Sequence, residues 1–115
     1  MAEVPKRAGP TALGVASATI YTAPADAAKW AIVRQVTITN EGAAAATVTL
    51  GIGTANTDAA GKRWLFKGTN CNPGESLDWT GFEPLAGHAT TPDLLYALAS
   101  AAATLTITVG LVEGP

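Results

Sequence analysis

The side chains that could do chemistry are few and scattered along the chain. His88 is the single histidine and the only group whose unperturbed pKa lies near neutral. A Ser-His-Asp site would need it beside a serine and a carboxylate, and Ser76, Ser100, Asp78 and Asp93 are available. Their spacing singles out none of them, so the sequence favours a loop histidine over a catalytic base. We therefore expect that the chain is not an enzyme.

Metal and cofactor motifs are not indicated either. One histidine and one cysteine, Cys71, without a Cys-x-x-Cys or His-x-x-x-His pair, cannot form a zinc site within this chain. Asn56 and Asp58 could supply oxygen ligands, but their loop lacks the carboxylate density of a calcium site. Gly61-Lys62 is followed by Arg63 rather than by Ser or Thr, and no predicted helix follows, so a phosphate loop is not indicated. We expect no metal and no cofactor.

The elements that would position any site are short β-strands. Alternation of apolar and polar residues at period two indicates half-buried strands. It is clearest in 104–112, and in 30–40 the larger side chains, Trp30 to Ile38, fall on even positions. The predicted strands span residues 18–23, 30–40, 47–53, 63–69, 75–82, 93–99 and 104–112. Seven to eight short strands without a long amphipathic helix predict an all-β fold, an antiparallel β-sandwich or a jelly-roll-like fold.

The first 17 residues differ from the rest of the chain. They contain Pro5, Gly9, Pro10 and Gly14 and show no sustained period. We expect residues 1–17 to form an extended N-terminal arm and residues 18–115 to form the β-sandwich domain. The arm either frays or orders against a neighbouring subunit. The residues suspected of that contact are Val4, Pro5, Lys6, Arg7, Pro10 and Leu13.

The three tryptophans are the most informative large side chains. Trp30, Trp64 and Trp79 are each in phase with the apolar side chains of their strands, which favours the core over exposed rings that stack on sugars. The same expectation holds for the other aromatic side chains, Tyr21, Phe66, Phe82 and Tyr96.

Composition limits the partners. Charged residues make up 14% of the chain, against about 25% in ordinary domains. The thin charge indicates either a surface covered by other chains or one solvated by Thr, Ser and Asn. A net charge of −2 without a basic stripe argues against nucleic acid. Apolar segments interrupted by Thr and Gly argue against a membrane span, and one cysteine with no apolar export segment fits a cytoplasm.

Several strand and turn phrases resemble one known group of proteins. They are Ile20–Ala25, Ala31–Asn40, Thr47–Leu50, Pro73–Leu77 with Trp79, Leu85–Gly87 and Leu105–Val109. Over residues 20–113 they resemble small structural proteins encoded by tailed bacteriophages. The resemblance implies a virion protein with a β-sandwich or jelly-roll-like fold. The chain departs from the group at Gly87-His88, where a longer loop through Pro92 leaves the register of strand 93–99 open.

The resemblance further implies a capsid decoration (cement) protein on the outer surface of the head. Its partner would be the major capsid protein, and a homo-oligomer, with a trimer favoured, would cover its sheet edges. The particle would be assembled in the host cytoplasm. The alternatives are a tail or baseplate protein, and a carbohydrate-binding host-attachment module. The last predicts at least two tryptophans exposed on one surface.

Overall fold

All seven predicted strands are present, and an eighth precedes them. The computed structural model describes residues 4–54, 61–101 and 104–114, and these ranges contain no helix. Asn56 and Asp58 lie outside them. The strands of the described residues are β1 (Val4–Ala12), β2 (Ala18–Thr22), β3 (Trp30–Asn40), β4 (Ala46–Gly53), β5 (Gly61–Cys71), β6 (Ser76–Ala86), β7 (Leu94–Ala99) and β8 (Leu105–Gly114).

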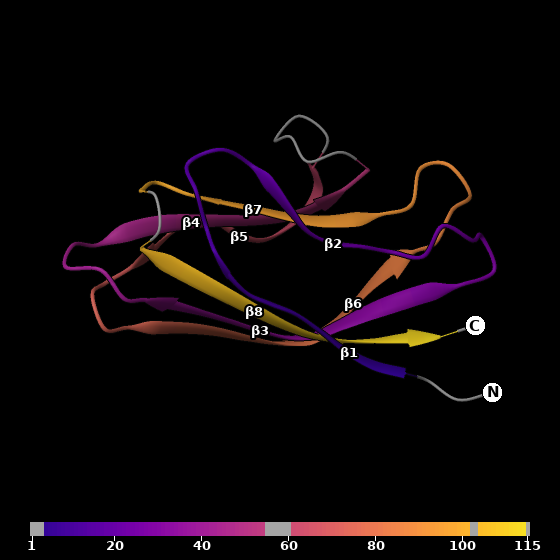
Figure 1. Ribbon diagram of the computed structural model, residues 1–115, viewed down its shortest axis with the longest axis horizontal. Helices are drawn as coiled ribbons and strands as arrows, with labels where there is room; N and C mark the ends of the chain where they lie inside the picture. The colour runs from indigo at the N-terminus through magenta and orange to yellow at the C-terminus, as the bar shows by residue number, and fades with distance from the viewer. Residues whose placement is uncertain (1–3, 55–60, 102–103, 115) are drawn as a thin grey trace.

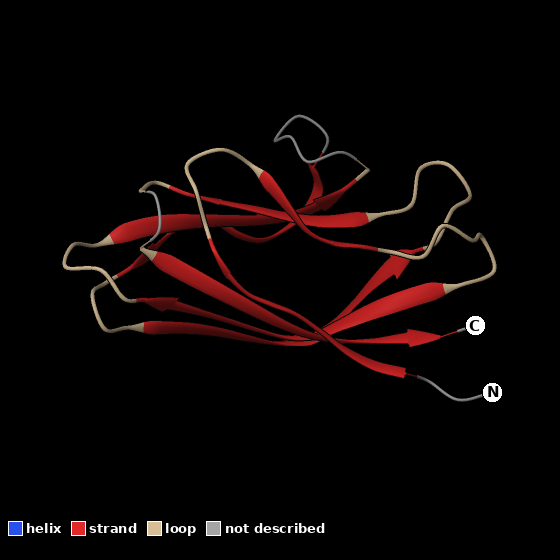
Figure 2. Ribbon diagram, in the orientation of Figure 1, coloured by secondary structure: helices blue, strands red, loops and turns tan. Residues whose placement is uncertain are grey.

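The strands form two stacked four-stranded sheets (Figure 1). Sheet A has the order β1-β8-β3-β6 and sheet B the order β2-β7-β4-β5. Every pairing is antiparallel, and Figure 2 shows only strands and loops in the described residues. This confirms the predicted all-β antiparallel sandwich.

Aliphatic side chains from both sheets fill the space between them. Ile38 and Ile107 from sheet A and Leu50 and Leu95 from sheet B are fully buried. Each such side chain stabilises the fold by about 1.5–3 kcal/mol through removal of apolar surface from water. In 105–111 every second residue is buried, as the alternation predicts.

The buried side-chain amide of Asn40 joins the turn after β3 to the end of β5. Asn40 is a polar side chain with only 1% of its surface exposed. Its Nδ2 donates to the carbonyl oxygens of Ala44 and Cys71 at 2.9 and 2.8 Å, and its Oδ1 accepts from the Gly42 backbone N–H. Burying an amide is tolerated only when its hydrogen bonds are made, so Asn40 fixes the turn after β3 against the end of β5.

The N-terminal segment differs from the expected arm. Val4–Ala12 forms β1, an edge strand of sheet A paired with β8, so the sandwich does not begin at residue 18. The prolines and Gly9 obscure the alternation in the sequence, but an edge strand tolerates them because one side of its backbone needs no ladder partner. A bulge between Ala8 and Thr11 absorbs the irregularity, and Gly9 has a φ of 90°, which favours glycine.

Strand β3 changes the face that it buries at Arg34. Ala31 and Val33 face the core before this point, and Val36 and Ile38 face it afterwards. On β8, Val33 pairs with Leu111 and Gln35 with Gly110, so Arg34 is an extra residue without a counterpart. Such a bulge reverses the phase of the alternation. The prediction that the even positions 30–38 share one face is therefore wrong for Trp30 and Ile32.

Register shifts lie side by side across sheet A. The shift in β1 follows Ala8, next to Arg7, which pairs with Gly110 of β8. Gly110 also pairs with Gln35, directly after the extra residue of β3. On β6 the register shifts between Thr80 and Glu83. This line of bulges divides the outer face of sheet A into two halves.

The tryptophans differ in position. Each indole covers a glycine: Trp30 covers Gly114, Trp64 covers Gly51 and Trp79 covers Gly81. Aromatic rings that cover strand glycines replace the missing side-chain packing. Trp79 packs against the core, as predicted. Trp30 lies on the outer face of sheet A, because the next residue, Ala31, faces the core. Trp64 lies on the outer face of sheet B, because it pairs with Gly51, which stands between the core residues Leu50 and Ile52. The core prediction is therefore wrong for these two tryptophans.

The remaining aromatic side chains also divide. Tyr21 and Phe66 pack against the core, in line with the prediction. Tyr96 is fully buried, as predicted, although its pairing with Gly51 places it on the same side of sheet B as Trp64. The Tyr96 ring meets Trp64 edge-on, with centroids 6.1 Å apart. Phe82 is 66% exposed, so the core prediction is wrong for this residue.

The Trp64–Gly51 contact supplies a test of the packing. A Cβ at Gly51 would lie 2.9 Å from Tyr96 Oη and 3.0 Å from the Trp64 ring. We expect Gly51→Ala to lower the free energy of unfolding by about 1–3 kcal/mol, the usual cost of overpacking, in urea denaturation. Gly14→Ala is the matched control, since its Cβ would meet its nearest neighbour only at 4.0 Å. Equal effects of the two substitutions would contradict the packing role.

Candidate interaction surface

The structure gives His88 a local role in a loop. Its Nδ1 accepts hydrogen bonds from the backbone N–H groups of Thr90 and Thr91 at 3.1 and 3.0 Å. The ring is exposed. In the described residues no serine or carboxylate is hydrogen-bonded to it, so the geometry of a nucleophile and a base is not assembled there.

The other candidate catalytic side chains bond to nearby strands. Ser76 Oγ lies 3.1 Å from the Thr39 hydroxyl, and Ser100 Oγ accepts from the Thr47 backbone N–H at 2.8 Å. Asp78 accepts from the Thr37 hydroxyl. Asp93 Oδ2 accepts from the Ala86 backbone N–H at 2.9 Å, joining the start of the β6–β7 loop to its end.

Cys71 is a buried thiol at the end of β5. Burial raises its pKa, and the neighbouring Glu75 carboxylate raises it further, although a backbone hydrogen bond at Asn40 opposes both. Its Sγ donates to the Glu75 carbonyl at 3.4 Å. The thiol form is favoured, which is typical of a structural cysteine. In the described part of the chain no three His, Cys, Asp or Glu side chains are grouped to hold a metal ion.

No helix in the described residues is long and apolar enough to cross a membrane.

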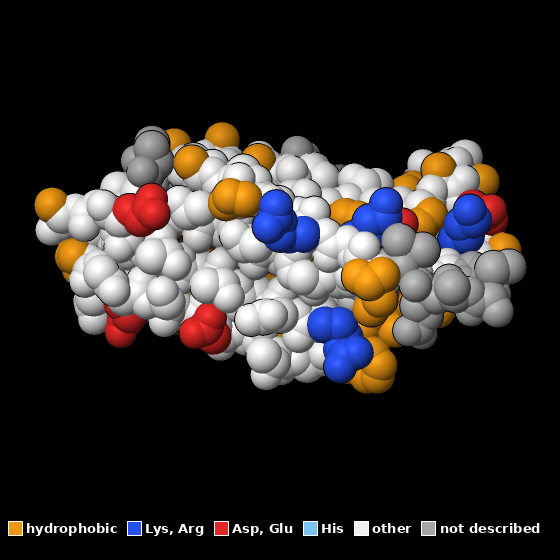
Figure 3. All heavy atoms as spheres, turned by 60° about the horizontal axis from the view of Figure 1, so that its bottom comes forward, with side chains coloured by type: hydrophobic (Ala, Val, Ile, Leu, Met, Phe, Trp, Pro, Cys, Tyr) orange, Lys and Arg blue, Asp and Glu red, His pale blue; other side chains and the backbone are white. Residues whose placement is uncertain are grey.

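The outer face of sheet A carries an apolar row that crosses all four strands. Pro5 pairs with Val112, Val112 with Ile32, and Ile32 with Pro84. Residues that are directly opposite in an antiparallel sheet present their side chains on the same face. Together with Trp30 in the next row and with Phe82, these residues form a surface that we call the apolar end. Figure 3 shows hydrophobic side chains gathered beside basic ones toward one end of this face.

The other half of the same face is polar. Beyond the line of bulges, Thr37 pairs with Thr108 and with Asp78, and Thr39 pairs with Thr106 and with Ser76. These hydroxyl-bearing side chains solvate the sheet with little charge. The sequence left two explanations for the thin surface charge, and this half of sheet A fits the solvation by Thr and Ser.

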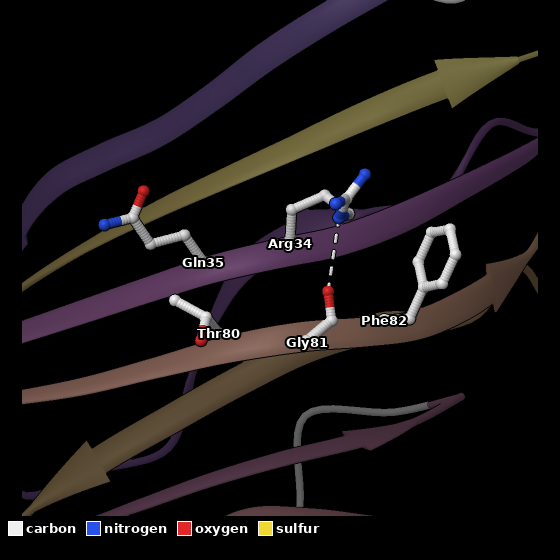
Figure 4. Close-up of a pocket in the computed structure, with 5 residues that line it drawn as sticks. All are labelled: Arg34, Gln35, Thr80, Gly81 and Phe82. Carbon is white, nitrogen blue, oxygen red and sulfur yellow. Dashed lines mark hydrogen bonds between the residues drawn. The ribbon is translucent and has the colours of Figure 1, made fainter.

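Arg34 and Phe82 stand where the two halves meet. The Arg34 guanidinium carbon lies 4.7 Å from the centroid of the Phe82 ring. Arg34 Nε donates to the Gly81 carbonyl at 3.2 Å. With Gln35 and Thr80 these residues line an open depression of about 640 Å³ (Figure 4). A cation over an aromatic face is stabilised by the ring quadrupole, so the ring and the Gly81 carbonyl together hold the Arg34 side chain in place.

The sequence analysis did not identify this pair. The core expectation for Phe82 was the one made for all the aromatic side chains. Two local signals point to the surface. Phe82 is at an even position, out of phase with Leu77 and Trp79, and it follows Gly81, since a glycine inside a strand often marks a bulge. The pairing of Phe82 with Arg34 depends on the β3–β6 register, which period-two analysis does not supply.

The suspected contact residues occupy different places. Pro5 and Arg7 lie on the outer face of sheet A, in the rows of Val112 and Gly110, and both are exposed. Pro10 is exposed at the β1 bulge.

Of the other three suspected residues, Leu13 and Lys6 are not on that face. Leu13 is 2% exposed and belongs to the core, so it does not offer a surface contact. For Val4 the structure describes the backbone, which pairs with Glu113. Lys6 pairs with the buried Leu111, and its Nζ lies 4.0 Å from Glu113.

A small polar cluster joins the two sheets beside β1. The Tyr21 hydroxyl of β2 donates to the Glu113 carboxylate of β8, which also faces Lys6 of β1. Burial raises the pKa of Tyr21, and the hydrogen bond to the Glu113 carboxylate and its charge raise it further. The cluster therefore ties the edge strand, the neighbouring strand and the opposite sheet together.

The sequence matches no protein-family model and no curated protein. The fold, in contrast, is similar to solved structures. A chain of the acid-stable capsid of Helicobacter pylori bacteriophage KHP30 has a TM-score of 0.57 at 12% identity, covering 97% of this chain and 89% of that one.

Two further structures share the fold. A chain of infectious bursal disease virus, Gx strain, has a TM-score of 0.56 at 11% identity, over 96% of this chain but 30% of that one. A chain of Bacillus endospore appendages, described as disulfide-linked pili, has a TM-score of 0.53 at 13% identity, over 97% and 83% of the two chains. These likenesses are of fold.

The Tyr21 cluster leads to a pH prediction. Tyr21→Phe removes the donor to Glu113 and should lower the free energy of unfolding by about 1 kcal/mol at neutral pH. The pKa of Tyr21 is raised above 10.0, its ordinary value. Its stabilisation is therefore complete below that pH and is lost as the pH rises toward the folded-state pKa.

Urea unfolding of both proteins between neutral pH and about pH 11 measures this loss. The difference between wild type and Tyr21→Phe should shrink at the alkaline end. A difference that stays constant with pH would show that the hydroxyl does not act through its protonated form.

Proposed function

We propose that this chain is a structural protein of a bacteriophage virion, a capsid decoration (cement) protein bound to the outer surface of the head. The observation that carries the proposal is the likeness of fold, along nearly the whole length of both chains, to a chain of a bacteriophage capsid structure. The resemblance of the strand phrases to tailed-phage structural proteins supports the same class. The role is structural rather than enzymatic.

The sheet edges support a role in an assembly. Sheet A ends in β1 and β6, and sheet B ends in β2 and β5. Exposed edges present unpaired backbone groups that soluble proteins must protect. A homo-oligomer, with a trimer at a threefold position as the proposed form, would cover some of these edges, and many weak contacts to a repeating lattice would add up to stable binding.

The proposed partner is the major capsid protein, with assembly in the host cytoplasm. Pro5, Lys6, Arg7 and Pro10 of β1 are the candidate contacts among the residues suspected from the sequence, because all four are exposed. The likeness to a chain of Bacillus endospore appendages supports the same broad class, a subunit that works within an assembly.

The tryptophan positions do not support a carbohydrate-binding module. Such a module predicts two indoles on one surface, but Trp30 and Trp64 lie on the outer faces of opposite sheets and Trp79 packs against the core. Each of the three rings already covers a glycine.

Counting the copies per particle tests the proposed function. Virions that carry this chain would be separated into heads and tails on a density gradient. Isotope-labelled peptides from this chain and from the major capsid protein would then quantify both by mass spectrometry. We expect hundreds of copies, all in the head fraction, as for a subunit that follows the capsid lattice. A handful of copies in the tail fraction would instead assign the chain to the tail or baseplate.

A further inference from the structure

The apolar end of sheet A is unusual for a soluble surface. Phe82 is 66% exposed, and it adjoins the apolar row that runs through Pro84, Ile32 and Val112 to Pro5. Isolated apolar side chains on a surface are ordinary, whereas contiguous apolar groups mark sites where another molecule binds. The row crosses the sheet from one edge to the other, so the surface it offers spans all four strands.

Arg34 brings a preorganised positive charge to this surface. Its Nε bonds to the Gly81 carbonyl and its guanidinium stacks on Phe82, so the side chain is constrained at two points. Among the described residues Arg34 forms no ion pair. A guanidinium presents a planar fork of donors that fits a carboxylate. Because the side chain is already ordered, binding a carboxylate there loses little additional entropy.

The strand register places two arginines, Arg34 and Arg7, on this face beside the apolar end, and Figure 3 also shows acidic side chains at this end of the molecule. Arg7 lies on the same face, in the row of Gly110. Of the strand carboxylates, Glu113 and Glu83 belong to the opposite side of sheet A, since they pair with buried residues of β3. Glu113 is moreover held by the Tyr21 hydroxyl. The complementary surface is therefore apolar and carries carboxylates.

Charge also argues against a second copy of this chain as the occupant. Two apolar ends that packed face to face about a twofold axis would bring their arginines toward each other, and like charges in an interface are strongly unfavourable. Asp78, a carboxylate on the outer face of sheet A, is already bonded to Thr37.

We propose that the apolar end is the docking surface for a different virion protein, whose contact surface combines apolar side chains with an Asp or Glu carboxylate. Arg34 binds the carboxylate, and Phe82 with the apolar row is buried against the partner. The inference rests on the proposed function and names the face of the molecule through which it acts.

Binding to heads assembled without this chain tests the proposal. The purified full-length protein would be mixed with such heads and pelleted with them, and the bound fraction would be titrated. We expect Arg34→Glu and Phe82→Ser each to weaken binding by about tenfold or more, as central contacts do. Binding of the wild type should also weaken with added salt, because the contact includes an ion pair.

The chain offers a matched control for each substitution. Lys67 lies 4.6 Å from the centroid of the Trp64 ring, so Lys67→Glu reverses a cation stacked on an aromatic ring of the other sheet. Val15 is 60% exposed in the segment between β1 and β2, so Val15→Ser removes an exposed apolar side chain elsewhere. We expect both controls to bind within about twofold of the wild type, since contacts outside an interface contribute little. Urea midpoints identify any variant that has lost its fold, and Arg34→Gln replaces Arg34→Glu in that case.

The outcomes separate the two proposals. Loss of binding by Lys67→Glu, with Arg34→Glu unaffected, would overturn the docking surface and leave the head-decoration function standing. Conversion of a wild-type oligomer into monomers by Phe82→Ser, seen by sedimentation velocity, would assign the apolar end to a second copy and overturn the inference. A wild-type protein that does not bind heads, and is absent from them by mass spectrometry, would contradict both.

Discussion

The fold depends on one extra residue in the middle of β3. Without the bulge at Arg34, β3 would keep one phase, and either Ala31 and Val33 or Val36 and Ile38 would leave the core. With the bulge, the strand buries Ala31 and Val33 at one end and Val36 and Ile38 at the other. The same reversal turns Trp30 and Ile32 outward, which places them on the surface rather than between the sheets. Core and surface are thus set by one local irregularity.

The sequence predicted the strands well where the alternation is unbroken. Residues 105–111 keep one phase throughout, so strand and core face were both predicted correctly. Strand β1 was not predicted as a strand, because Pro5 and Pro10 remove the local signal while tertiary pairing with β8 restores the element. Whether such a segment forms a strand depends on its pairing with another strand, and here the paired residues are about 100 positions apart in the chain.

The sequence predicted the candidate interaction surface less well than it predicted the strands. Arg34 and Phe82 meet because irregularities in two neighbouring strands lie opposite each other. In the sequence, each irregularity by itself only displaces one residue from the alternation of apolar and polar side chains. Thin surface charge, by contrast, was visible in the composition, and the structure divides it between a threonine-rich half and an apolar half of one sheet face.

The pairing of each indole with a glycine has an optical consequence. Indole emission responds to the water around the ring, and here the three rings report on three places: the outer face of sheet A at Trp30, the outer face of sheet B at Trp64, and the core beside β6 at Trp79. Proteins that keep one indole at a time would therefore behave as separate probes. A molecule that covers one sheet would shift the emission of one probe toward the blue and leave the probe on the opposite sheet as an internal reference.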